Sequence, residues 1–445
     1  MPLSPLDDRY ANKVSELEPI FSEFGLMRAR TKVEAEWFLF LSEKGIVPKI
    51  DTKKLKKIIE DFGEKEYLRI KEIEKTTNHD VKAVEIFLRE FVPKNTWQWI
   101  HFGCTSEDIN NTSYALLFQE GIGVILEALD SVLDDILAKA KQWKSVPMLS
   151  RTHGQTATPT TLGKEFLVFL SRLEQITGDW TDLPFPAKFS GATGTFAAHN
   201  AALPKIDWIT YSQEFVEGEL GLDWNPLTTQ IEPHDGQAMV LNDFCLVANI
   251  LIDLCRDIWG YISLGYFGQK VVKGEVGSST MPHKVNPIDF ENAEGNFKFM
   301  RGIARTLADE LPISRWQRDL TDSTLQRNFG LVFGHFLLGL KSLRKGLSKI
   351  ELKVGANGHS PIAEDLKNSP EVLTEAVQTV LRAHGHADAY DQLKKFSRGQ
   401  ALSLKEIQKF IDSTDLPKAE KDRLKKLTPE TYTGLAEKLV DIFIQ

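Results

Sequence analysis

The segment Ala238–Leu264 constrains the fold of this chain most, because it is long, lacks proline and is apolar on most of its sides. Apolar residues recur along it at steps of three, four and seven, the spacing that places side chains on one face of a helix. These residues are Val240, Phe244, Val247, Leu251, Leu254 and Ile258. Further apolar residues widen the stripe almost all round, so several neighbours must cover the helix.

Three other long segments show helical spacing and contain no proline. Thr112–Val146 would extend roughly 50 Å as a helix. Thr160–Trp180 is entered through Pro159 near its first turn, and Asp319–Ile350 is a further helix of this kind. Alternating strand patterns are scarce, and the best of them, Ala187–Phe196, contains glycines that indicate a bend rather than the core of a sheet.

Long helices with wide apolar faces predict an all-α fold built around a large bundle. We expect three helical domains: an N-terminal domain over 1–110, a central long-helix bundle over 111–365 and a small C-terminal domain over 366–445. Stripes this wide are hard to cover within one chain. We therefore expect helices from several subunits to share one core in a closed homo-oligomer.

The composition disfavours several classes of protein. A formal net charge of -8 over 445 residues argues against a nucleic-acid-binding surface. The three cysteines form no CxxC pair and no HExxH motif occurs, so we expect neither a disulfide framework nor a metal site. The N-terminus lacks the pattern of a signal peptide, and no apolar run is long enough to span a membrane. We expect a cytoplasmic protein without membrane contact.

The segment Gly277–Pro287 reads GSSTMPHKVNP and is too rich in small and restricted residues to form a buried helix. It offers backbone N–H groups, side-chain donors and the charge of Lys284 together, which suits a carboxylate ligand. Gly274 and Gly277 would let the wider loop, 274–290, open and close as a lid. From these residues alone, a solvated polar loop is an equal alternative.

This segment resembles the signature of the fumarase, aspartase and argininosuccinate lyase superfamily. It is most similar to the adenylosuccinate lyase branch, in the bacterial form that has KVNP. The resemblance covers essentially the whole chain, with the motifs in the expected order. Further matching segments are SPLDDRY (4–10), TTNHDVKAVE (76–85), HFGCTSEDINN (101–111), SRTHGQTATP (150–159), TTQIEPHD (228–235) and SRWQRDLTDSTLQRN (314–328).

The resemblance implies a lyase of purine nucleotide biosynthesis that releases fumarate by β-elimination. The implied substrates are adenylosuccinate, which gives AMP, and the succinylaminoimidazole-carboxamide ribotide, which gives the carboxamide ribotide. The resemblance also implies that no cofactor takes part and that three subunits of a homotetramer contribute to each site.

Elimination requires a base for the weakly acidic carbon proton, an acid for the departing nitrogen and fixed donors for the carboxylate that takes up the charge. By position in the family motifs, Ser278 is the expected base, activated by Lys284 and backbone N–H groups. His153 is the expected acid, since imidazole can carry a proton near neutral pH. His79 is expected to hold the substrate or His153 in place, and the alternative makes His79 the acid.

Two expected helix starts supply further substrate contacts. Asn78, His79 and Asp80 belong to the first, where Asp80 either fixes the tautomer of His79 or caps the helix. Thr105 and Ser106 resemble the family's donors to the substrate carboxylate. A capping box that begins at Thr105 explains the same residues, and both roles can hold because a helix N-terminus is an anion site.

The phosphate end of a nucleotide needs cationic and hydroxyl donors, and five residues match the family's pattern for them. They are Arg9, Tyr10, Arg318, Ser323 and Arg327. The other expected contacts to the succinyl group or the nucleotide are Gln230, Ser279, Lys284, Val285, Asn286, Asn292, Thr324, Leu325 and Gln326.

Two alternatives have to be weighed against this function. The first is a sister enzyme with the same loop, such as argininosuccinate lyase, fumarase, aspartase or a muconate-cyclising relative, none of which binds a nucleotide phosphate. The second is a non-enzymatic helical scaffold. A scaffold would not require Ser278, His153, Lys284 and Asn286 together, so we favour an enzyme.

Overall fold

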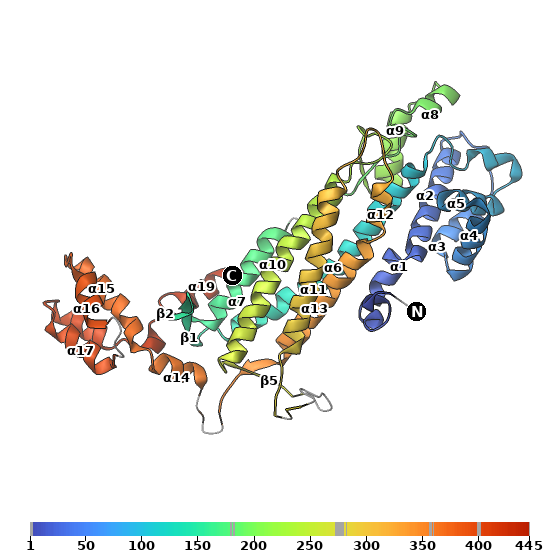
Figure 1. Ribbon diagram of the computed structural model, residues 1–445. Helices are drawn as coiled ribbons and strands as arrows, with labels where there is room; N and C mark the ends of the chain where they lie inside the picture. Colours follow the sequence, from blue (N-terminus) through green and yellow to red (C-terminus); the bar gives the residue numbers. More distant parts are fainter. Residues whose placement is uncertain are drawn as a thin grey trace. The chain divides into compact units, whose positions relative to one another are not determined.

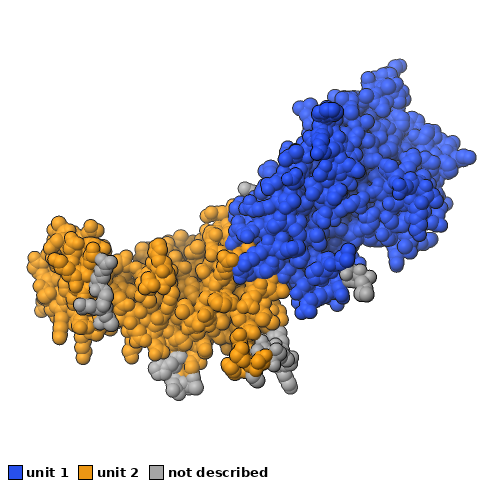
Figure 2. All heavy atoms as spheres, in the orientation of Figure 1, with its two compact units in different colours: residues 1–129, 176–249, 293–341 blue, residues 130–175, 250–292, 342–445 orange. Residues whose placement is uncertain are grey.

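Helices dominate the computed structural model of the chain, and the predicted all-α fold is confirmed (Figure 1). The structure describes residues 3–178, 180, 183–271, 280–281, 283–355, 358, 360–397 and 402–444. These residues fall into two compact units (Figure 2). Unit 1 comprises residues 1–129, 176–249 and 293–341, and unit 2 comprises residues 130–175, 250–292 and 342–445. The three consecutive domains expected from the sequence stay a prediction.

Four long helices begin in one unit and end in the other. They are α6 (Ser106–Gln142), α10 (Asp235–Ser263), α11 (Ile288–Glu310) and α13 (Phe329–Lys349). Within unit 1 they pack through aromatic rings. The Phe333 ring of α13 lies 5.1 Å from Phe118 of α6 and 5.3 Å from Phe244 of α10, measured between centroids. These helices form the predicted bundle, and α10 confirms the helix predicted from the wide apolar stripe.

Among the described residues, α10 is also the one helix long and apolar enough to cross a membrane by length and composition. Two thirds of its most apolar window, 67%, is buried inside the protein. That burial is typical of a core helix, because its wide apolar face needs neighbours on several sides.

The single helix predicted over Asp319–Ile350 is wrong, because the chain forms α12 (Thr321–Gln326) and then α13. The side-chain amide of Asn328 donates to the carbonyl oxygen of Thr324 at 2.9 Å. In a continuous helix the backbone N–H of Asn328 would bind that oxygen, but here it donates to Leu325. A local side-chain hydrogen bond therefore replaces a helical one and ends α12.

The rest of unit 1 is a helical layer around a separate part of the core that includes Trp37, Phe38 and Phe87. Short helical turns occupy 5–7, 11–13, 15–17, 89–91 and 94–99, with a π-helical turn at 214–219. The α-helices are α1 (Glu18–Phe21), α2 (Glu23–Glu43), α3 (Lys53–Glu60), α4 (Glu64–Thr77), α5 (Asp80–Leu88), α8 (Ala197–Ala202) and α9 (Trp208–Gln213). The parallel pair β3 (Pro186–Ala187) and β4 (Asp223–Trp224) ends where the predicted bend begins, and Gly191 and Gly194 in that segment have φ 81° and 72°.

Unit 2 contains a hairpin that the sequence did not suggest, formed by β1 (Pro147–Thr152) and β2 (Gln155–Thr161). Pro159 pairs with Leu149 inside this hairpin, so its predicted place in the first turn of a helix is wrong, and α7 (Leu162–Thr177) begins later. The ladder is irregular between Leu149 and Ser150, where a residue without a backbone N–H can be accommodated.

A second antiparallel pair in unit 2 joins β5 (Phe267–Gln269) to β6 (Ile350–Leu352). The following helices are α14 (Pro361–Lys367), α15 (Thr374–Ala383), α16 (Ala389–Ser397), α17 (Leu404–Ser413), α18 (Lys418–Lys425) and α19 (Ala436–Ile444), with short turns at 370–373 and 429–431. Helices α15 to α18 surround a separate apolar cluster that includes Leu381, Leu393 and Ile411.

Candidate active site

The N-terminus of α6 carries Thr105 and Ser106 and is fixed by Asp108. One oxygen of Asp108 accepts from the backbone N–H of Thr105 at 2.7 Å, which is half of the capping box considered for this segment. The other oxygen accepts from the N–H of Ser190 at 2.8 Å and pairs with the Lys188 ammonium group at 2.7 Å. Asp108 and Lys188 are fully buried, so their ion pair and the hydrogen bonds of Asp108 anchor this end of α6.

The guanidinium group of Arg318 lies beside this helix end. It donates to Gln230 at 3.1 Å and to Glu107 at 2.9 Å. Gln230 and Arg318 also line an open hollow of about 390 Å³ together with Trp316, Gln317, Asp319 and Leu320. Two residues predicted to bind the substrate, far apart in the sequence, thus line the same hollow.

The second predicted phosphate arginine, Arg327, forms ion pairs with Glu23 at 3.0 Å and Asp80 at 3.1 Å. Asp80 pairs in turn with Arg30 at 2.8 Å. Burial alone would raise the pKa of Asp80, but Arg30 and Arg327 outweigh that effect and lower it. Asp80 therefore stays ionised between two guanidinium groups.

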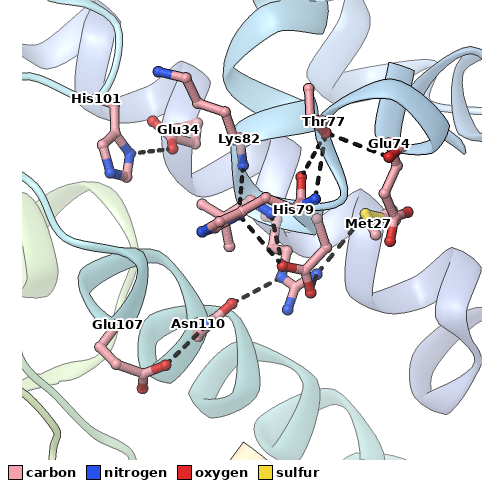
Figure 3. Close-up of polar contacts among 12 residues, drawn as sticks. Met27, Glu34, Glu74, Thr77, His79, Lys82, His101, Glu107 and Asn110 are labelled. Atoms are coloured by element: carbon pink, nitrogen blue, oxygen red, sulfur yellow. Dashed lines mark hydrogen bonds and ion pairs between the residues drawn. The ribbon is translucent and has the colours of Figure 1, made fainter. Parts of the chain in front are cut away.

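One polar network connects these two groups of residues within unit 1, and Figure 3 shows part of it. Arg30 donates through Nε to the Asn110 amide oxygen at 2.9 Å, and Asn110 donates to Glu107 at 2.9 Å. The network therefore runs from Arg327 through Asp80, Arg30, Asn110 and Glu107 to Arg318. It brings together elements that are distant in the sequence.

The sequence prediction did not include Arg30, Glu107 or Asn110. A signal for Arg30 exists, because it is a charged residue within the apolar run of α2 and is only 2% exposed. Glu107 stands in the acidic first turn of α6 and looks like an ordinary helix-start residue. Burial raises its pKa, and Arg318 counteracts the rise.

His79 is the N-cap of α5, whereas Asp80 is the first residue of the helix and accepts from the Val81 N–H at 2.9 Å. The Nδ1 atom of His79 accepts from the backbone N–H of Lys82 at 3.2 Å, so a neutral ring carries its proton on Nε2. Asp80 is 3.8 Å from that nitrogen and is held by arginines instead. Asn78, immediately before the cap, is left-handed at φ 50° and exposed.

A second histidine of the same region, His101, was not predicted as part of the site. Its Nδ1 atom lies 2.6 Å from a carboxylate oxygen of the fully buried Glu34 (Figure 3). Burial lowers the pKa of His101, but the pairing with Glu34 outweighs burial and raises it to about 9. His101 is therefore protonated at neutral pH, and it lies in the segment that leads into Thr105.

The remaining predicted residues of unit 1 differ in accessibility. Arg9 is exposed and lies over the Tyr10 ring at 5.7 Å. Ser323, Thr324 and Leu325 lie on α12 and are at least partly exposed. Gln326 also lies on α12, but it is buried, and its amide contacts His234 at 3.4 Å and Gln237 at 3.5 Å. A contact between its side chain and substrate stays a prediction.

In unit 2, His153 stands at the turn of the β1–β2 hairpin in the left-handed region, at φ 55°, next to Gly154 at φ 75°. Its ring is exposed and has no hydrogen-bond partner among the described residues. The imidazole of His153 at this turn is therefore accessible to a ligand or to another chain.

The predicted catalytic loop is described only in part. Ser278 and Ser279 lie outside the described residues, so the predicted base has no described position. Lys284 and Val285 are exposed, and the Val285 carbonyl accepts from Gln269 at 3.1 Å. Asn286 and Asn292 are partly buried, and Asn292 accepts from the Ser342 hydroxyl at 2.7 Å.

Comparison with known proteins first defines the class. The model of a family described as lyase matches residues 8–302. The solved structure of a fumarate lyase from Mesorhizobium sp. BNC1 shares the fold, with a TM-score of 0.78, 20% sequence identity and coverage of 96% of this chain and 97% of that one. The helical fold and the family match therefore define a lyase.

The particular family follows from closer relatives. A model described as adenylosuccinate lyase C-terminal matches residues 314–433. The chain is 46% identical to adenylosuccinate lyase of Legionella pneumophila (strain Corby), over 99% of this chain and 98% of the relative. It is 47% identical to that of Vibrio cholerae serotype O1 (strain ATCC 39541 / Classical Ogawa 395 / O395), with the same coverage. The chain belongs to the adenylosuccinate lyase family.

Proposed function

We propose that this chain eliminates fumarate from adenylosuccinate, giving AMP, and from the succinylaminoimidazole-carboxamide ribotide in purine nucleotide biosynthesis. One observation supports the proposal most strongly: in a member of this family, one network of ion pairs and hydrogen bonds links the two arginines that we expect to bind phosphate. In this network Arg318 pairs with Glu107 in the first turn of α6, and Arg327 pairs with Asp80. A substrate with a phosphate at one end and two carboxylates at the other needs several cationic or N–H sites.

The proposed chemistry divides between a base and an acid. Ser278 removes the carbon proton, and His153 protonates the departing nitrogen. The exposed position of the His153 ring at a hairpin turn supports this role, because an acid has to reach the substrate. Lys284 and Asn286 then contact the carboxylate that takes up negative charge, so the carbanion is stabilised electrostatically.

Substrate binding uses the donors of unit 1. Thr105 and Ser106 bind a carboxylate at the start of α6, while Arg318, Ser323 and Arg327 bind phosphate. The other proposed contacts are Arg9, Tyr10, Asn78, His79, Asp80, Gln230, Ser279, Val285, Asn292, Thr324, Leu325 and Gln326. Both arginines are paired with carboxylates, so the phosphate adds to an existing charge network instead of meeting isolated cations.

We further propose a cytoplasmic homotetramer with sites shared between subunits. Large apolar side chains remain exposed on the long helices of a single chain and support this proposal. On α10, Met239 is 60% and Leu246 48% exposed, and on α11 Phe299 is 57% exposed. Large apolar side chains that are exposed on helices favour contact with a second chain.

The activity is tested by incubating the purified protein with adenylosuccinate and measuring fumarate and AMP together. We expect equimolar release of both products, and fumarate release from the carboxamide ribotide precursor as well. Argininosuccinate and malate serve as comparison substrates. Turnover of either of these without turnover of adenylosuccinate would reject the proposal in favour of a sister enzyme.

A further inference from the structure

Three polar side chains meet in unit 2 close to the hairpin that carries His153. Arg151 on β1 donates to the Tyr266 hydroxyl oxygen at 2.8 Å and also pairs with Asp365 on α14. The Tyr266 hydroxyl in turn donates to the same oxygen of Asp365. The phenol thus uses both its acceptor and its donor, and each of the three residues bonds to the other two.

These residues come from three parts of the chain. Arg151 precedes His153 by two residues on the strand that ends at the turn. Tyr266 immediately precedes β5, and its carbonyl oxygen accepts from the Lys353 N–H at 3.0 Å beside β6. Asp365 lies on α14, which packs against β1. The cluster therefore connects the hairpin to a strand pair and to a helix.

The position of the His153 ring depends on its backbone, because the ring has no hydrogen-bond partner among the described residues. The turn has two residues in the left-handed region, His153 and Gly154, and a two-stranded hairpin alone is only marginally stable. Arg151 is a side chain near the turn that is fixed from outside the hairpin. A shift of about 1 Å in a reacting group can cost about 100-fold in rate.

We propose that Arg151, Tyr266 and Asp365 form a positioning triad that holds the β1–β2 hairpin so that His153 meets the substrate in the correct geometry. The inference rests on the proposed role of His153 as acid. None of the three residues touches the reacting atoms; they act through the backbone between Arg151 and His153. Their loss should reduce turnover and leave binding by the residues of unit 1 intact.

The test removes a single oxygen atom, with the substitution Tyr266→Phe in the full-length oligomer. We expect kcat for adenylosuccinate to fall about 10- to 100-fold, with KM within about twofold of the wild-type value. The matched control is Tyr390→Phe, which removes the phenol hydroxyl of an exposed tyrosine on α16 in the same unit. The control should keep wild-type kcat.

A second comparison distinguishes positioning from general damage. In a His153→Ala background, measured at high enzyme concentration, Tyr266→Phe should cause no further loss, because the group that it positions is absent. An equal loss in both backgrounds, or wild-type kcat in Tyr266→Phe, would overturn the triad. If Tyr266→Phe lowers the melting temperature, Asp365→Asn, which keeps the side-chain shape, replaces it in both backgrounds.

Failure of the proposed function looks different. It would appear as a wild-type protein that releases no fumarate from adenylosuccinate, or as a His153→Ala variant with full activity. If wild-type turnover is normal, His153→Ala is impaired and Tyr266→Phe is unchanged, the triad alone is rejected.

Discussion

The guanidinium group of Arg318 lies 2.9 Å from the carboxylate of Glu107, which is only 2% exposed. Arg318 also donates to Gln230 and lines an open hollow with it. Arg318 thus neutralises a buried carboxylate, and in the proposed function it also binds the phosphate of the substrate. Removal of one partner of a buried pair costs more than removal of both.

Arg318→Ala should therefore destabilise the protein and weaken nucleotide binding at once. We expect a loss of about 2 kcal/mol in the free energy of unfolding, less than for a fully buried pair because Arg318 is partly exposed. Adding Glu107→Gln should restore most of that stability but leave KM for adenylosuccinate raised. Urea unfolding and steady-state kinetics of both variants measure the two effects. Recovery of KM in the double variant would contradict a direct role of Arg318 in binding.

The buried pair of Lys188 and Asp108 supports the start of α6. Lys188→Met leaves Asp108 fully buried without its cation, so we expect a loss of about 3–5 kcal/mol in the free energy of unfolding. Lys298→Met removes an exposed partner of Glu294 on α11 and should cost less than about 1 kcal/mol. Urea unfolding of the two variants side by side checks the difference, and equal losses would show that the buried pair has no special role.

The stability of the pair formed by His101 and Glu34 should depend on pH. The pKa of His101 in the folded protein is raised to about 9 from an ordinary value of 6.5, so the folded state binds the proton more tightly. The stabilisation of the folded state by protonated His101 is fully present below about pH 6.5 and is lost as the pH rises through about 9.

We expect this loss to be about 3 kcal/mol in the free energy of unfolding between pH 6 and pH 10. The measurement is urea unfolding at several pH values, compared with Glu34→Gln, in which this part of the pH dependence should disappear. The same slope in both proteins would show that another group titrates.

Ser278→Ala should nearly abolish turnover while adenylosuccinate still binds, because the proposed role of this hydroxyl is to remove a proton and not to bind the substrate. His153→Ala should reduce kcat by about 100- to 10,000-fold, the usual contribution of general acid or base catalysis. Rapid-quench kinetics and equilibrium binding separate the two effects. A change confined to KM in either variant would assign that residue to binding.

The sequence by itself determined the all-α class, the longest helices and the family, and it named candidate site residues. Helical spacing depends on neighbours three and four positions apart, so α6 and α10 could be predicted from their own residues. The motifs that resemble the family likewise named Arg318, Arg327 and His153 in advance. The β1–β2 hairpin escaped prediction, because its pairing depends on contacts across the turn and not on a clear alternation.

Only the tertiary structure decided which charges meet. Arg30 and Asp80, or Glu107 and Arg318, are far apart in the chain, and neither segment of a pair indicates that the other lies beside it. Their pairing follows from the packing of α2, α5 and α6 and the segment before α12 in unit 1. Burial then forces each charge to find a partner, since an unpaired charge away from water is too costly to keep. For that reason a local pattern predicts a helix, whereas the neighbours of a buried charge follow only from the folded chain.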